Sequence, residues 1–137
     1  MITIDNGNIK RKTLKRTNKE IRTIIGSLAD KKAKNIIVLD IRKISQLTDF
    51  IIIASGASDR QIGAITGNVL NSIKKKPLAI EGADTSRWVV IDYGDKIIHV
   101  FLEDLRSFYN LEGLWPEAKE FIVPDRASTA ASSIARG

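Results

Sequence analysis

Residues 88–102 read Trp88-Val89-Val90-Ile91-Asp92-Tyr93-Gly94-Asp95-Lys96-Ile97-Ile98-His99-Val100-Phe101-Leu102, two apolar runs on either side of Gly94-Asp95. Glycine readily adopts the positive φ that a tight hairpin connection requires. The stretch therefore predicts a β-hairpin. The predicted partners are Trp88 with Phe101, Val90 with His99, Ile91 with Ile98 and Tyr93 with Lys96.

The two faces of this hairpin differ in chemistry, because side chains alternate between faces along a strand. One face is aliphatic and typical of a core: Val89, Ile91, Ile98 and Val100. The other, the aromatic face, carries Trp88, Val90, Asp92, Ile97, His99 and Phe101. Aromatic side chains mixed with polar ones are typical of protein interfaces, so we expect this face to be only partly covered by its own chain. The alternative is that a helix covers it and His99 is an ordinary core histidine.

The remaining pattern alternates helices with strands. A capping box at Thr17-Asn18-Lys19-Glu20 begins a helix over about 17–32, and Ser58 with Gln61 begins a second that ends before Pro77. Branched apolar runs predict buried strands over 36–41 and 50–55, with a short strand over 78–80. A last helix follows Glu103. This order predicts an α/β fold, a mixed β-sheet of about five strands flanked by helices.

Length and charge divide the chain into three parts: a flexible basic arm (1–16), a single α/β domain (17–120) and a flexible Ala/Ser-rich tail (121–137). Residues 1–34 contain ten Lys or Arg and three acidic residues, whereas residues 78–125 contain four basic and ten acidic residues. We therefore expect nucleic-acid contact only through the arm, and attraction of the folded part to a basic protein.

Composition excludes several classes of function. The 137 residues include no cysteine and one histidine, which excludes disulfides and thiolate chemistry and argues against a zinc site. No apolar run approaches the roughly 18 residues of a membrane span, and no signal peptide is recognisable. The sequence predicts a cytoplasmic protein without a metal or cofactor.

Three motifs suggest chemistry without completing a site. The turn Ser55-Gly56-Ala57-Ser58 precedes a helix and could bind an anion, but it is not a phosphate loop, and a tight turn with a helix cap is the stronger interpretation. Asp40 and Asp49 could hold a divalent metal, yet the Asp-x-Asp pair usual in phosphoryl transfer is missing. Ser55, His99 and Asp92 could form a nucleophile set, but nothing places Ser55 beside the other two. We expect no enzymatic activity.

Residues 38–115 resemble the ribosomal silencing factor family, also called Iojap-like (RsfS). The resemblance rests on motifs that occur in order and at matching spacing. They are Leu39-Asp40, Leu47-Thr48-Asp49-Phe50, the run 54–61 (ASGASDRQ), Glu81-Gly82, the run 88–95 (WVVIDYGD), His99-Val100-Phe101 and the run 106–115 (RSFYNLEGLW). The arm and the tail after about residue 120 are not covered.

The resemblance implies a nucleotidyltransferase-like topology without the catalytic carboxylates, and no cofactor. It implies binding to ribosomal protein L-fourteen, a basic protein of the large ribosomal subunit, where the factor sterically blocks association with the small subunit and represses translation. It is also compatible with a homodimer.

Carried onto this sequence, the family's partner-binding residues are Trp88, Tyr93 and His99, and we add Asp92 and Phe101 from the aromatic face. Arg106 and Tyr109 also match the family, as packing or interface rim. The alternative function is a nucleotide-dependent transferase that uses the Ser55–Ser58 turn with Asp40 and Asp49. Titration with nucleotide and Mg²⁺ distinguishes the two.

Overall fold

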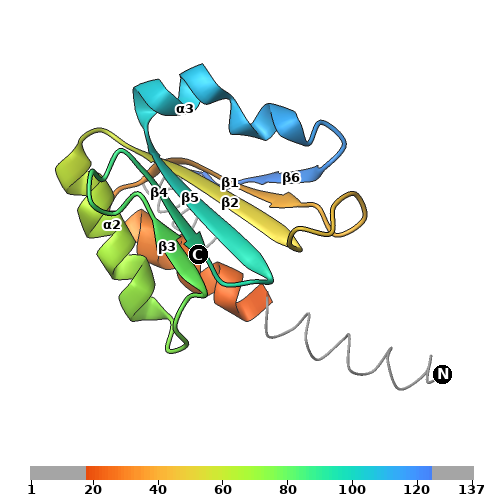
Figure 1. Cartoon of the computed structure of the whole chain (residues 1–137), viewed down its shortest axis with the longest axis horizontal. Helices are drawn as coiled ribbons and strands as arrows, with labels where there is room; N and C mark the ends of the chain where they lie inside the picture. The colour runs from red at the N-terminus through yellow and green to blue at the C-terminus, as the bar shows by residue number, and fades with distance from the viewer. Residues whose placement is uncertain (1–17, 125–137) are drawn as a thin grey trace, which may run out of the picture.

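A mixed β-sheet of six strands forms the centre of the protein (Figure 1). The computed structural model describes residues 18–124 of the chain. The strands, in the spatial order β3-β4-β5-β2-β1-β6, are β1 (Lys34–Asp40), β2 (Phe50–Gly56), β3 (Ala79–Glu81), β4 (Trp88–Asp92), β5 (Lys96–Leu102) and β6 (Lys119–Ile122). The helical segments are the first helix (residues 18–30), α2 (Asp59–Ser72), α3 (Glu103–Tyr109) and the 3-10 helix η1 (Leu111–Leu114).

The hairpin has the predicted register. Trp88 lies opposite Phe101, Val90 opposite His99 and Ile91 opposite Ile98. The backbone N–H of Tyr93 donates to the carbonyl of Lys96 at 2.9 Å, which closes the turn. Gly94 has φ +90°, the left-handed conformation for which glycine was expected at this position.

The central pair of strands runs parallel. β5 continues the sheet by pairing with β2, so that Ile51 lies beside Ile97 and Ile53 beside His99. β2 is buried along its whole length, as its unbroken apolar sequence predicts for a strand covered on both faces. The predicted mixed α/β sheet is therefore confirmed.

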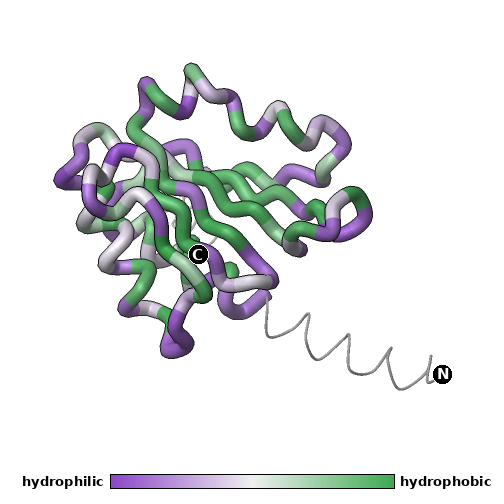
Figure 2. The backbone as a smooth tube through the Cα atoms, in the orientation of Figure 1, coloured by the Kyte–Doolittle hydropathy of each residue, from purple (hydrophilic) through white to green (hydrophobic). Residues whose placement is uncertain are grey.

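Helices cover the two faces of the sheet unequally. The first helix and α2 pack on one face, where Ile24, Leu28 and Ile65 meet the aliphatic side of the hairpin. On the opposite face lie α3 and η1 (Figures 1 and 2). These two elements contribute Leu105 and Leu111 to a second apolar cluster. This second cluster includes Phe101, so the hairpin's aromatic face is covered more than its mixture of side chains suggested.

A sixth strand exceeds the expected count of about five. β6 pairs antiparallel with β1 at one edge of the sheet, and the N–H of Val123 donates to the carbonyl of Ile36 at 2.9 Å. All four β6 residues are exposed, so they carry no alternation of burial that a pattern could reveal. The strand extends beyond the predicted domain end at 120; the predicted arm and most of the predicted tail lie outside the described residues.

Within residues 18–124, none of the helices has the length and apolar character that crossing a membrane requires.

Candidate functional site

Five aromatic rings form a continuous cluster where the hairpin meets α3. The ring centroids of Phe101 and Trp88 are 4.5 Å apart, and those of Trp88 and Tyr109 are 5.0 Å apart. His99 lies 6.0 Å from Phe101, and Phe108 meets Tyr109 edge-on at 5.1 Å. Such offset and edge-to-face arrangements are the favourable ones for aromatic pairs. We call these five residues the aromatic cluster.

Burial falls steeply across the aromatic cluster. Phe101 is fully buried and His99 is 9% exposed, whereas Tyr109 is 51% and Phe108 80% exposed. Trp88 is half-buried between them. Large exposed aromatic side chains backed by buried ones are typical of a protein-docking surface. The members of the aromatic cluster that are open to solvent are therefore Trp88, Tyr109 and Phe108, which we call the aromatic patch.

His99 supports this patch as a neutral side chain. The indole Nε1–H of Trp88 donates to His99 Nδ1 at 3.1 Å, which fixes the orientation of both rings. Burial lowers the pKa of His99 to about 4, because desolvation penalises the imidazolium. His99 is thus buried in the folded chain, as in the alternative interpretation, while its contacts are with Trp88 and Phe101 of the hairpin.

Tyr93 and Asp92, the other two hairpin residues predicted to bind a partner, make contacts within the fold. Tyr93 is 6% exposed and belongs to the apolar cluster on the opposite face, under the first helix and α2. Asp92 is half-buried, and its carboxylate accepts the N–H of Gly94 at 2.8 Å, which stabilises the turn. The structure therefore brings Trp88, His99 and Phe101 together and leaves Tyr93 and Asp92 outside the cluster.

Arg106 holds α3 and η1 against the sheet. Its side chain is 9% exposed; its Nη1 donates to the carbonyl of Asn35 and, at 2.8 Å, to Ser55 Oγ. Its Nε donates to a carboxylate oxygen of Glu112 at 3.3 Å. These contacts join the start of β1, the end of β2 and η1. A helix of seven residues is marginal alone, so Arg106 positions the element that carries Phe108 and Tyr109.

Backbone N–H groups at the Ser55–Ser58 turn donate to side chains of the same segment. The hydroxyl of Ser58 accepts the N–H of Gln61 at 3.1 Å, and Gln61 Oε1 accepts the N–H of Ala57 at 2.7 Å. Ser58 is therefore the N-cap of α2, with Gln61 reaching back as its sequence position predicted. The hydroxyl oxygen of Ser55 accepts a hydrogen bond from Arg106. This arrangement is that of a tight turn with a helix cap.

The candidate catalytic groups do not converge. Asp40 binds Arg42 at 2.6 Å, and this ion pair holds the pKa of Asp40 below its usual value. Across residues 18–124, His, Asp and Glu side chains nowhere gather in a group of three that could hold a metal ion. Ser55, His99 and Asp92 hydrogen-bond to Arg106, Trp88 and Gly94 respectively, and not to one another.

Comparisons with known proteins agree with this architecture. The family model described as "Ribosomal silencing factor during starvation" matches residues 14–136. The chain is 37% identical over 106 residues to a ribosomal silencing factor of Halalkalibacterium halodurans, covering 74% of this chain and 91% of the relative. It is 41% identical over 92 residues to one from Bacillus subtilis, covering 65% of this chain and 78% of the relative. A crystal structure from Chromobacterium violaceum superposes with a TM-score of 0.69 at 33% identity, covering 80% of this chain and 94% of the other.

Proposed function

The chain belongs to the ribosomal silencing factor family, and on that premise we propose that it docks on the large ribosomal subunit and represses translation. The proposed partner is ribosomal protein L-fourteen, in the cytoplasm. Occupation of that surface would exclude the small subunit sterically. The single observation that supports docking is the aromatic patch, which exposes large rings above the buried side chains of Phe101 and His99.

The proposed contact residues follow from exposure. Phe108, Tyr109 and the exposed edge of Trp88 would touch the partner, since they are the members of the aromatic cluster open to solvent. His99 and Phe101 would act from beneath, by fixing the position of Trp88. Tyr93 and Asp92 would contribute only by stabilising the hairpin and its turn.

Charge favours a basic partner. Glu103 and Asp104 are exposed in the first turn of α3, the element that carries Phe108 and Tyr109. Acidic residues outnumber basic ones by ten to four over residues 78–125. Complementary charge accelerates association and orients the encounter, while the aromatic patch would supply most of the binding free energy.

A steric repressor needs no catalysis, and nothing at the alternative site favours a transferase. The Asp40 carboxylate is paired with Arg42, and the Ser55 hydroxyl with Arg106. A nucleotide would have to displace Arg42 from Asp40 or Arg106 from Ser55. We therefore propose binding without chemistry as the function.

Co-sedimentation with isolated large subunits tests docking through the aromatic patch. Phe108→Ala removes an 80% exposed ring, so the fold should persist while binding weakens by roughly tenfold to thirtyfold, the range of an interface hot spot. Phe121→Ala is the matched control, because it removes a 46% exposed phenyl ring from β6. Phe121 pairs with Val38, which belongs to the apolar cluster on the face of the sheet opposite to α3. Equal binding by the parent and Phe108→Ala would place docking elsewhere.

A further inference from the structure

A second charged surface lies at the end of the molecule away from α3. The beginning of the first helix meets the loop after α2 there, whereas α3 lies across the opposite face of the sheet (Figure 1). The basic residues of this end that the structure describes are Lys19, Arg22, Lys74, Lys75, Lys76 and Lys96. We call this region the basic pole.

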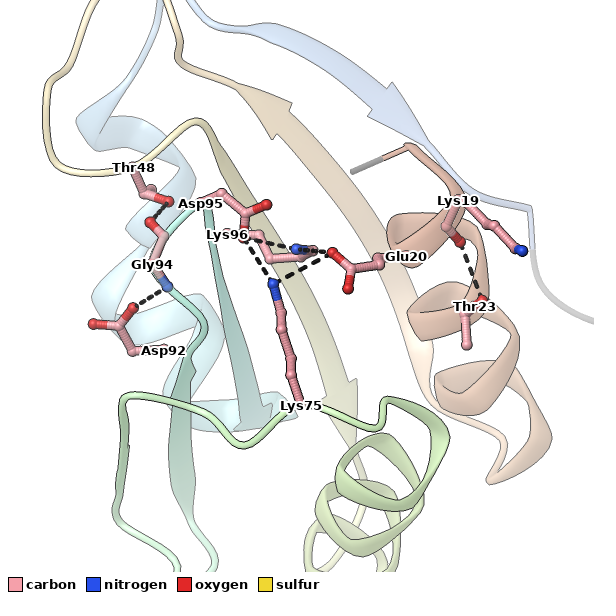
Figure 3. Close-up of polar contacts among 9 residues, drawn as sticks. All are labelled: Lys19, Glu20, Thr23, Thr48, Lys75, Asp92, Gly94, Asp95 and Lys96. Atoms are coloured by element: carbon pink, nitrogen blue, oxygen red, sulfur yellow. Dashed lines mark hydrogen bonds and ion pairs between the residues drawn. The ribbon is translucent and has the colours of Figure 1, made fainter. Parts of the chain in front are cut away.

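Two acidic residues of the basic pole, Glu20 and Asp95, are already neutralised. Lys96 is fully buried, and its amine contacts Glu20 at 2.8 Å and Asp95 at 2.7 Å. Lys75 approaches the same two carboxylates at 3.4 and 3.8 Å (Figure 3). A buried lysine requires such pairing, so Glu20 and Asp95 are committed to the fold and cannot compensate the remaining lysines.

The remaining positive charges face solvent. Lys19, Lys74 and Lys76 are exposed, and among the residues that the structure describes no carboxylate lies within ion-pair distance of their amines. A hollow of about 340 Å³ separates the first helix from the end of α2, and Lys19, Lys74, Lys75 and the paired Glu20 line it. The hydroxyls of Thr23 and Ser72 on its wall donate to helix carbonyls, so the lysine ammonium groups are the charged donors left for an anion.

The sequence continues this charge toward the N-terminus. Residues 6–17, directly before the first helix, contain Lys10, Arg11, Lys12, Lys15 and Arg16 and no acidic residue. The basic pole is thus the point at which the folded domain meets the most basic segment of the chain.

We propose that the basic pole binds the phosphate backbone of ribosomal RNA while the aromatic patch binds protein. This inference rests on the proposed function and adds a second contact to it. Lysines are mobile point charges that suit phosphate without reading sequence, and a ribosomal surface presents closely spaced phosphates beside its proteins. The opposed charges of the two ends would orient the protein, with its acidic side toward a basic protein and its basic pole toward RNA.

Salt dependence of binding to large subunits tests the inference. Each phosphate contact releases counterions, so the logarithm of the binding constant falls linearly with the logarithm of the salt concentration. The double variant Lys74→Gln with Lys76→Gln loses two such contacts, and its slope should be less steep by about 1.5. Lys31→Gln with Lys32→Gln is the matched control. Both lysines are exposed at the end of the first helix, so their substitution removes the same charge from another site. In the fold, their carbonyls accept from Gln61, and this contact does not involve their amines.

The outcomes separate this inference from the proposed function. Equal slopes for the two double variants would overturn RNA contact at the basic pole, whether or not Phe108→Ala weakens binding. If the parent fails to bind subunits at all, docking is wrong, and fluorescence anisotropy with a short RNA duplex of unrelated sequence still decides the inference. There, the Lys74/Lys76 variant should bind more weakly than the Lys31/Lys32 variant. Preference for polyglutamate over the duplex would instead indicate an acidic protein partner and overturn it.

Discussion

At the scale of single residues, His99 has a charge state set by its surroundings. Burial lowers its pKa to about 4, and its Nδ1 accepts a hydrogen bond from Trp88, which requires that nitrogen to be unprotonated. Trp88 and His99 therefore behave as one neutral unit at physiological pH. The aromatic patch should keep the same shape and charge across the range in which an ordinary histidine titrates.

This pKa predicts how stability depends on pH. The unfolded chain binds a proton at His99 near pH 6.5 and the folded chain only near pH 4, so the unfolded state is favoured as pH falls through this window. The stabilisation from neutral His99 should be complete above pH 6.5 and decline toward pH 4, by up to about 3 kcal/mol.

Nuclear magnetic resonance can follow this titration directly, because His99 is the only histidine in the chain. We expect the imidazole signals to stay unchanged from pH 8 to pH 5 and to titrate only near pH 4, unless the protein unfolds first. His99→Gln should remove the His99 part of the pH dependence of unfolding. A midpoint near 6.5 in the folded protein would contradict the buried, Trp88-bonded imidazole.

At the scale of elements, α3 and η1 depend on a contact that is distant in sequence. Arg106 reaches Asn35, 71 residues away, and Ser55, 51 residues away. This segment carries the exposed rings of Phe108 and Tyr109, which we propose dock on the partner, and it also covers Phe101. Loss of Arg106 should therefore affect binding and stability together.

Arg106→Met tests this dependence. The variant leaves Glu112 and the carbonyl of Asn35 without their partner, and breaking a mostly buried ion pair costs about 2 kcal/mol or more. Denaturant unfolding should show that loss, and amide exchange in α3 should accelerate more than exchange in β2. Glu112→Gln, which keeps the size of the side chain, should cost less. Uniform acceleration throughout the sheet would show that Arg106 acts on the whole fold and not on α3.

Local patterns predicted most elements, and distant partners explain what they missed. The hairpin register follows from Gly94 and from alternation within 15 residues, so it could be predicted. Burial of Lys96 could not, because its partner Glu20 lies 76 residues earlier. The exposed strand β6 carried no periodic signal.

Only the part of the candidate site that depends on local sequence could be predicted. Trp88, His99 and Phe101 were identified from one strand pair, and the structure brings them together. Phe108 was not predicted to bind a partner, and Tyr109 was assigned only to packing or the rim, since their contact with Trp88 depends on how α3 crosses the sheet. Their unusual pattern, two adjacent aromatics in a short helix with an acidic first turn, was a signal that could have pointed to them.

At the scale of the whole molecule, the two surfaces lie apart. The aromatic patch is on α3 and β4, and the basic pole is where the first helix meets the end of α2 (Figures 1 and 3). Between them lie the two apolar clusters that cover the faces of the sheet. A body of this kind can act by occupying space.

The most direct test of silencing by occupancy is a subunit-joining experiment on a sucrose gradient. Purified small and large subunits are mixed after the large subunits have been incubated with increasing amounts of this protein. The joined-ribosome peak should fall in proportion to the fraction of large subunits occupied and approach zero once the protein exceeds them, without nucleotide triphosphate. An undiminished peak at saturating protein, or inhibition that needs ATP or far fewer molecules than subunits, would contradict the account.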